Sequence, residues 1–104
     1  MLKKENLQWK GYNLPIVYAK AEVNTHNQSA TFYLGASREK IDNGEWIDKI
    51  ENVSFEWDRL QDPVVCAYNQ AKGSKTIEYK DEQTQEIQTI TIYGVLYGWV
   101  DDYS

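Results

Sequence analysis

The pattern of apolar and polar positions predicts several short strands and one helix. In residues 16–23 the odd-numbered positions are apolar, while Lys20 and Glu22 alternate with them, which is typical of a half-buried strand. A second alternating run covers residues 30–36, and the polar cluster 24–29 separates the two runs. Together they predict an antiparallel hairpin.

The alternation stops in the charged segment 37–46 and returns in residues 51–57. Asn43-Gly44 is a strong turn signal because both residues tolerate positive φ. One turn of helix is expected over residues 37–41, with Ser37 as its cap. The next run places Val53, Phe55 and Trp57 on one face and predicts a third strand.

A helix is predicted from Pro63 to about Lys72. Asp62 is a favourable N-cap, and proline suits the first helical position because its missing N–H would have no partner there. Gly73 is expected to adopt the left-handed conformation that often follows a helix. A helix of about ten residues is marginal alone, so packing on the sheet must hold it. Its apolar stripe consists of Val64, Val65, Tyr68 and Ala71.

The last third of the chain predicts a second hairpin and an apolar tail. Residues 76–80 alternate, the sequence DEQTQE at 81–86 is a polar turn, and residues 87–93 are rich in β-branched side chains. The segment YGVLYGWVDDYS then either completes the sheet or docks on a partner. The expected fold class is α+β: a mainly antiparallel β-sheet of four to six strands with one α-helix packed on one face, in a single domain over residues 1–104.

Length and charge limit the classes of function. A chain of 104 residues can fold as one domain, and its net charge of −5 argues against nucleic acid, which requires clustered Lys and Arg. The adjacent basic pair Lys3-Lys4 is expected to be a solvated end. Neither an apolar run of about 20 residues nor a signal-peptide pattern occurs, so we expect a soluble protein that is made in a cytoplasm and binds no membrane.

The candidate nucleophiles and metal ligands are few. His26 lies in a polar turn, and a metal site or a general base would require converging partners. Cys66 lies between Val65 and Ala67 in the predicted helix, which favours a core thiol over a reactive one.

The paired carboxylates do not indicate a hydrolase. Asp81-Glu82 lies in a turn and Asp101-Asp102 near the C-terminus, and adjacent side chains of an extended chain point in opposite directions, so both pairs are expected to be solvated. Phosphate-loop, dinucleotide, nucleophile-elbow and CxxC motifs do not occur. We therefore expect no enzyme activity, no catalytic residue, no cofactor and no metal.

Aromatic residues are the one surplus, with four Trp, eight Tyr and two Phe. Any single aromatic residue is more often part of the core than of an interface. Clustered aromatics at the end of the chain suggest an interface with another protein. The predicted partner-binding residues are Tyr93, Tyr97, Trp99 and Tyr103.

Part of the chain resembles a group of phage proteins. GYNLPIVY, with Gly11, Leu14, Pro15 and Tyr18, is similar to the Gly-x-x-Leu-Pro-x-x-Tyr opening of small uncharacterised late-gene proteins, encoded in the tail region of tailed phages and prophages of Gram-positive bacteria. SREKIDNGEW resembles their Lys/Glu-rich insert, and PVVCAYNQAK resembles their Gln-Ala-Tyr-type helix. The resemblance covers residues 11–72, whereas those chains end soon after the helix. It implies a virion, tail or assembly-related protein and no catalytic residues.

The leading hypothesis is a non-catalytic, phage-encoded protein that acts by binding a protein partner or by self-association. The resemblance suggests a part in tail or baseplate assembly and a place in the host cytoplasm or on the virion. One alternative is a carbohydrate-binding module that uses exposed Trp and Tyr side chains as stacking platforms. Another is an inhibitor of a host protein.

Overall fold

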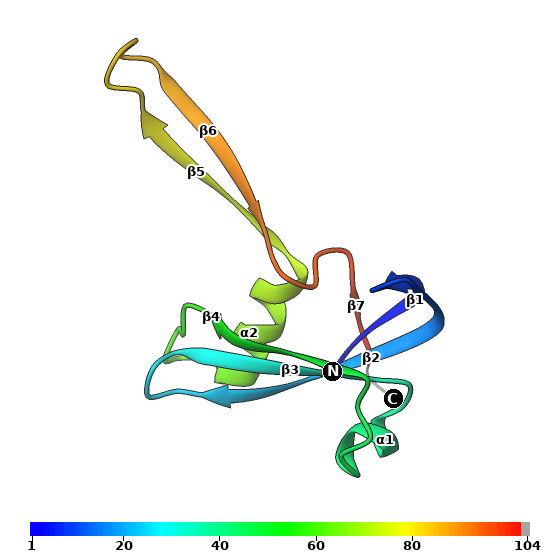
Figure 1. Cartoon of the computed structure of the whole chain (residues 1–104). Helices are drawn as coiled ribbons and strands as arrows, with labels where there is room; N and C mark the ends of the chain where they lie inside the picture. The colour runs from blue at the N-terminus through cyan, green and yellow to red at the C-terminus, as the bar shows by residue number, and fades with distance from the viewer. Residues whose placement is uncertain (103–104) are drawn as a thin grey trace.

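The computed structural model describes residues 1–102 as a five-stranded antiparallel sheet, a helix on one of its faces and a projecting hairpin (Figure 1). The strand order is β4-β3-β2-β1-β7, and a separate two-stranded sheet contains β5 and β6. The expected α+β class is confirmed. The elements are β1 (Leu2–Trp9), β2 (Tyr12–Asn24), β3 (Ser29–Gly35), α1 (Arg38–Asp42), β4 (Asp48–Ser54), α2 (Pro63–Lys72), β5 (Ser74–Lys80), β6 (Ile87–Tyr93) and β7 (Val100–Asp101).

The β2–β3 hairpin forms the centre of the sheet. Its register pairs Ala21 with Phe32 and Ala19 with Leu34, and the strands meet at the polar turn that the sequence predicts. Because side chains alternate along a strand, one face receives the apolar positions of both strands. That face is buried and consists of Val17, Ala19, Ala21, Ala30, Phe32 and Leu34.

Helix α2 covers this buried face. The carboxylate of Asp62 accepts a hydrogen bond from the Val64 N–H at 2.8 Å, which confirms the predicted N-cap. The small residues Cys66, Ala67 and Ala71 are buried against the sheet, whereas Val65, predicted in the apolar stripe, is exposed. Small side chains let the helix axis lie close to the strands. Val64, Tyr68 and Ala71 pack on the core as predicted, and Cys66 and Ala67 are buried where Val65 was expected.

The prediction for Gly73 was wrong. Its φ of −100° and ψ of −166° are extended rather than left-handed, and β5 begins at the next residue. A side chain at this position would press on the carbonyl oxygen of Asn69. Glycine is therefore required here for close approach to the helix end.

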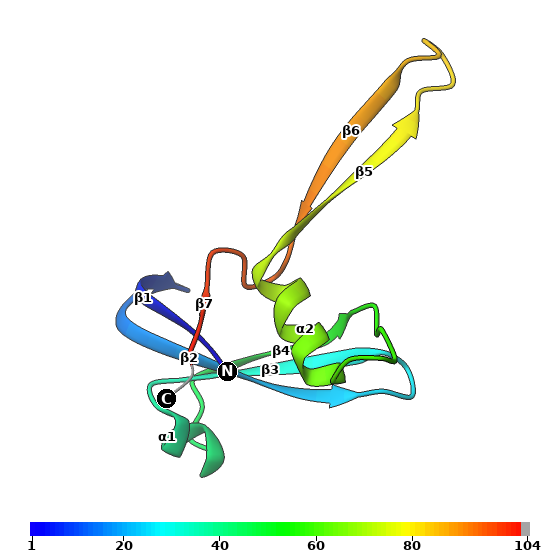
Figure 2. The same cartoon turned by 180° about the vertical axis from the view of Figure 1, so that it is seen from behind.

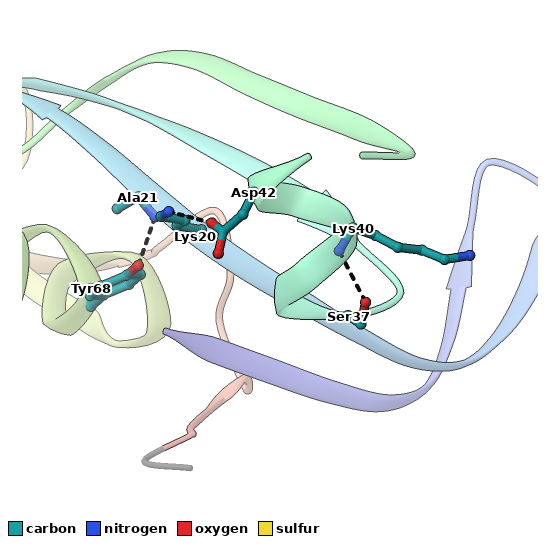
Figure 3. A network of polar contacts seen from close by, with 6 residues as sticks. All are labelled: Lys20, Ala21, Ser37, Lys40, Asp42 and Tyr68. Atoms are coloured by element: carbon teal, nitrogen blue, oxygen red, sulfur yellow. Dashed lines mark hydrogen bonds and ion pairs between the residues drawn. The ribbon is translucent and has the colours of Figure 1, made fainter. Parts of the chain in front are cut away.

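Tyr68 bonds the backbone of β2 just beyond the point where β1 begins. The β1–β2 ladder extends only to the Leu2–Ala19 pair, so β2 has no β1 neighbour beyond that point. The Tyr68 hydroxyl accepts a hydrogen bond from the Ala21 N–H at 2.7 Å (Figure 3). The helix thereby satisfies a backbone donor that the sheet leaves unpaired.

Helix α1 packs near the opposite face of the sheet. Ser37 caps it as predicted, because its hydroxyl accepts a hydrogen bond from the Lys40 N–H at 3.1 Å (Figure 3). Asp42 pairs with Lys20 of β2 at 2.6 Å, and Ile41 is buried. Lys20 and Ala21 point to opposite sides of β2, so the two helices lie on opposite sides of the sheet.

The N-terminal segment is a strand rather than a solvated end. Leu2 is fully buried, and β1 pairs with β2 over most of its length and with β7 on its other edge. Lys3 and Lys4 lie within this strand. Their charges made this segment look solvated in the sequence, whereas its pairing with β2 holds it in the sheet.

Strand β4 ends earlier than predicted. It stops at Ser54, and the ladder with β3 shifts register between Ala30 and Phe32, close to Asn52 with its positive φ of 56°. Phe55 is nevertheless buried in the core. The expected face of alternating side chains is therefore interrupted by a bulge.

Residues 94–102 complete the core. Leu96 is fully buried, and Trp99 is 6% exposed. The N–H groups of Leu96 and Gly98 donate to the carbonyls of Ala71 (2.9 Å) and Lys72 (3.4 Å), at the C-terminal end of α2. Of the two alternatives for this segment, completion of the sheet and core is the one that the structure shows.

The carboxylates that follow are paired rather than solvated. Asp101 forms an ion pair with Lys72 of α2. Asp102 is buried, forms an ion pair with Arg38 at 3.3 Å, and donates its N–H to the Met1 carbonyl at 2.9 Å. These contacts join the two ends of the described chain, so the expectation of a solvated acidic pair is corrected.

Candidate functional site

The most exposed part of the chain is the hairpin of β5 and β6, which we call the arm (residues 74–93). It projects from the C-terminal end of α2, away from the rest of the chain, which we call the body (Figures 1 and 2). The structure is 53 Å long, and its radius of gyration is 16.0 Å, against about 13 Å for a compact chain of this length. Every residue of both strands is exposed.

The arm has one apolar face. Its register pairs Ile77 with Ile90 and Lys75 with Ile92, and paired residues lie on the same face. The exposed fractions are 41% for Ile77, 49% for Ile90 and 45% for Ile92, and 42% for Tyr79, whose hydroxyl bonds Gln88 at 2.7 Å. In the part of the chain that is described, the hairpin extends away from the helices and from the other strands (Figures 1 and 2). We call Ile77, Tyr79, Ile90 and Ile92 the apolar face.

The opposite face of the arm is mainly polar. Thr76 lies opposite Thr91, and Glu78 lies opposite Thr89. Only Ile87 near the turn and Tyr93 at the base add apolar surface there. The hairpin is therefore amphipathic in the manner of a strand pair that covers a core, although the described residues provide no core beneath it.

A groove of about 460 Å³ lies at the base of the arm. Phe55 and Ala71 contribute apolar lining from the body, and Val95 contributes from the segment after the arm. Lys75 and Ile92 also line the groove. The groove and the apolar face are consequently one continuous surface.

The outer edges of the two sheets differ. Edge strand β4 carries Lys49 and Glu51 and is distorted near Asn52, which are features that discourage pairing with another strand. Strand β6, with the sequence IQTITIY, has no charge, no proline and no glycine. Within the described residues, its outer edge pairs with no other strand.

The four predicted partner-binding residues do not form one surface. Tyr93 and Tyr97 are exposed, and their rings lie 4.6 Å apart at 59° beside the base of the arm. Trp99 is buried in the core, which corrects the expectation that its side chain is available to a partner. Tyr103 lies outside the described residues.

The apolar face was not predicted because the large aromatic residues are the more obvious interface signal in this sequence. The signal was present in the sequence as Ile77 and Tyr79 in one predicted strand and Ile90 and Ile92 in the other, with the polar turn setting the register. Each strand has the pattern of an ordinary half-buried strand, and that pattern does not indicate whether another part of the chain packs on its apolar side.

The candidate chemical groups stay apart. His26 is exposed in the β2–β3 turn, and Cys66 is buried with its sulfur 3.6 Å from the Gln61 side-chain oxygen. Asp81 is engaged in the arm's turn, where its carboxylate accepts a hydrogen bond from the Gln83 N–H. Across residues 1–102, no group of three His, Cys, Asp or Glu side chains could hold a metal ion. No helix in that range is long and apolar enough to cross a bilayer.

The clearest electrostatic perturbation lies in the body. Asp48, at the start of β4, accepts hydrogen bonds from Lys10 at 2.7 Å and from the Trp9 indole N–H at 2.8 Å. These two donors, with the Lys49 N–H, lower the pKa of Asp48 from 3.8 to about 2. The contact fastens the β1–β2 turn to the far edge strand, which is a structural role.

Comparisons with known proteins give no match for this chain among family models, curated proteins or solved structures.

Proposed function

We propose that this chain is a non-catalytic protein that binds another protein through the apolar face of the arm. The observation that carries the proposal is that face itself: Ile77, Tyr79, Ile90 and Ile92 share one side of a projecting hairpin, and each is 41–49% exposed among the residues that the structure describes. An exposed apolar surface that continues into a groove is typical of a protein-interaction site.

The energetics of a hairpin support this reading. A two-stranded hairpin is only marginally stable alone in water, and the arm's contacts with the body lie at its base. Covering apolar surface contributes about 25 cal/mol per Å². A partner that covers the apolar face would therefore stabilise the arm while it binds.

The biological context that we propose is phage tail or baseplate assembly. Its support is the resemblance over residues 11–72 to late-gene proteins of tailed phages. The arm lies beyond this range, so it would be an addition to the resembling part. Projecting arms suit assembly because they reach past the surface of their own subunit.

The carbohydrate-binding alternative has weaker support. Stacking on a sugar requires an exposed ring with a free face, and the exposed Tyr93 and Tyr97 rings are tilted against each other by 59°. Trp99 is buried, and Trp57 donates its indole N–H to the Gln61 carbonyl at 3.1 Å. The host-inhibitor alternative is a special case of protein binding, and the same experiment addresses it.

Site-specific photocrosslinking tests the proposal. The residue p-benzoylphenylalanine would replace Tyr79 on the apolar face or, as the matched control, Thr89 on the polar face. Each full-length variant would be irradiated alone and in an extract of the cells that make the chain. We expect a discrete protein adduct from position 79 and little from position 89. Equal labelling from both positions, or no adduct from either, would count against the proposal.

A further inference from the structure

We infer that the partner of the arm is a second copy of this chain, with the two arms packed antiparallel, apolar face against apolar face. The inference rests on the proposed function and gives it a partner. A two-fold axis would pass close to the Ile77–Ile90 pair, so that each arm supplies the same surface to the other.

The charges along the arm support the antiparallel arrangement. Lys75 lies on the apolar side at the base, and Asp81 and Glu86 follow that side at the tip, because the Asp81 N–H still bonds the Glu86 carbonyl at 2.9 Å. The face therefore carries Lys75, which lies 3.8 Å from Glu56 of the body, at its base, apolar residues in its middle and acids at its tip. With the axis at the Ile77–Ile90 level, antiparallel arms place each Lys75 at the Tyr79 level of the other copy. That copy's Asp81 and Glu86 lie one residue pair further on along the same face, about 7 Å away and within reach of the lysine side chain. A parallel arrangement would place like charges together.

The apolar residues match in the same arrangement. Ile77 and Ile90 lie midway along the seven-residue strands, so they meet their own copies near the axis. Ile92 near the base then faces the Tyr79 level of the other arm. Between Lys75 and Asp81 the apolar face of each arm carries no charge, because Glu78 and Lys80 lie on the polar face.

The groove extends the contact beyond the strands. An antiparallel arm places its turn, residues 81–86, near the base of the other arm, where the groove of about 460 Å³ opens and Lys75 forms part of the lining. Each copy would both offer a turn and receive one. The bodies, whose chains each carry a net charge of −5, would lie at opposite ends of the paired arms.

The size of the surface sets the expected strength. A seven-residue strand pair is roughly 24 Å long and about 10 Å wide, so the face covers about 240 Å² on each copy, well below the roughly 800 Å² of a standard interface. The groove contact adds to this area. We therefore expect a reversible dimer with a dissociation constant of about 10 µM or weaker.

Sedimentation velocity of the full chain from about 1 to 300 µM, around the expected constant, tests the inference. We expect a monomer–dimer equilibrium that Ile90→Glu weakens at least tenfold, because each dimer would bury two added charges. Thr91→Glu, one position away on the polar face, should leave the constant within about twofold. A chain that stays monomeric, or a dimer that Thr91→Glu disrupts as strongly, would overturn face-to-face packing.

A charge exchange tests the orientation. Lys75→Glu and Glu86→Lys should each weaken the dimer by roughly three- to tenfold, since a two-fold axis repeats each exposed ion pair. The double variant should recover most of the loss because its opposite charges face each other again. A double variant that is additive in its losses would overturn the antiparallel arrangement.

Crosslinking separates this inference from the function on which it rests. With Cys66→Ala as background, Ile90→Cys should be joined between copies by a short bis-maleimide, whereas Thr91→Cys should not. If the chain is monomeric and position 79 photocrosslinks a different protein, self-association is overturned and protein binding by the arm stands. If neither experiment yields an adduct, both fail.

Discussion

The body and the arm are built from the same local pattern and have opposite surroundings. In β2 and β3 the alternating apolar side chains are buried beneath α2 and residues 94–102. In β5 and β6 an equally regular alternation remains exposed on every residue. Alternation therefore specifies which side of a strand needs cover, and segments distant in the sequence determine whether the same chain supplies it.

The largest effect on the free energy of unfolding should distinguish buried from exposed residues within the C-terminal segment 94–102, which we call the tail. Trp99→Ala removes a core side chain and should lower the free energy of unfolding by about 3–5 kcal/mol. Val100→Ala, at an exposed neighbouring position, should change it by no more than about 0.5 kcal/mol. Urea unfolding followed by circular dichroism measures both. Equal effects would mean that the tail is not part of the core.

A smaller loss should follow from removing one hydrogen bond between α2 and the sheet. Tyr68→Phe leaves the Ala21 N–H without its acceptor and should cost about 1–2 kcal/mol. The matched change in the arm is Tyr79→Phe, which removes an exposed bond to Gln88 and should cost less than about 0.5 kcal/mol. Thermal unfolding of both variants would rank them, and the reverse order would contradict the contrast between body and arm.

Excision of the arm should leave the body almost unchanged. Joining Ser74 to Tyr93 through Asn-Gly keeps their cross-strand pair and supplies a two-residue hairpin turn. We expect a free energy of unfolding within about 1 kcal/mol of that of the full chain, because surface changes away from the core are mild. Small-angle scattering at low concentration should give a radius of gyration below 16.0 Å. An unfolded product would show that the arm belongs to the folding unit.

The smallest effect concerns acid stability. Folding lowers the pKa of Asp48 from 3.8 to about 2, so its ionised form stabilises the body above pH 4 and this contribution is lost as pH falls towards 2. Asp48→Asn should be less stable than the wild type at pH 7, and the difference should shrink between pH 4 and pH 2. Melting temperatures across that range measure it.

Glu56→Gln is the matched control for Asp48→Asn at the base of the arm. Glu56 approaches Lys75 at 3.8 Å with both side chains largely exposed, so its removal should give a difference that hardly depends on pH. A similar pH dependence in both variants would mean that the Asp48 contact has no special role.

Local signals in the sequence predicted much of the fold. Neighbouring residues alone determine the caps at Asp62 and Ser37 and the turn between β2 and β3. The same holds for both strands of the arm. Strand β1 was missed because its lysines hide the alternation, and its stability comes from the ladder with β2. The bulge near Asn52 likewise depends on pairing with β3.

The candidate site was harder to predict than the fold. Aromatic content drew attention to Trp99, whose burial depends on how the tail returns across the body. The isoleucines of the arm were visible in the sequence. Their exposure depends on whether another segment packs on them, and the local pattern does not carry that information. The conformation of Gly73 was missed for a related reason, since β5 starts directly at the helix end.

The attachment of the arm gives it a fixed direction. The Gly94 N–H donates to the Gly73 carbonyl at 2.9 Å, and a side chain on Gly94 would overlap the backbone carbonyls of Gln70 and Ala71. Both strands are thus seated against the last turn of a helix that is itself anchored in the core. The axis of α2 therefore sets the direction of the arm. Because the base of the arm is already held in place, binding to a partner would cost little conformational entropy there.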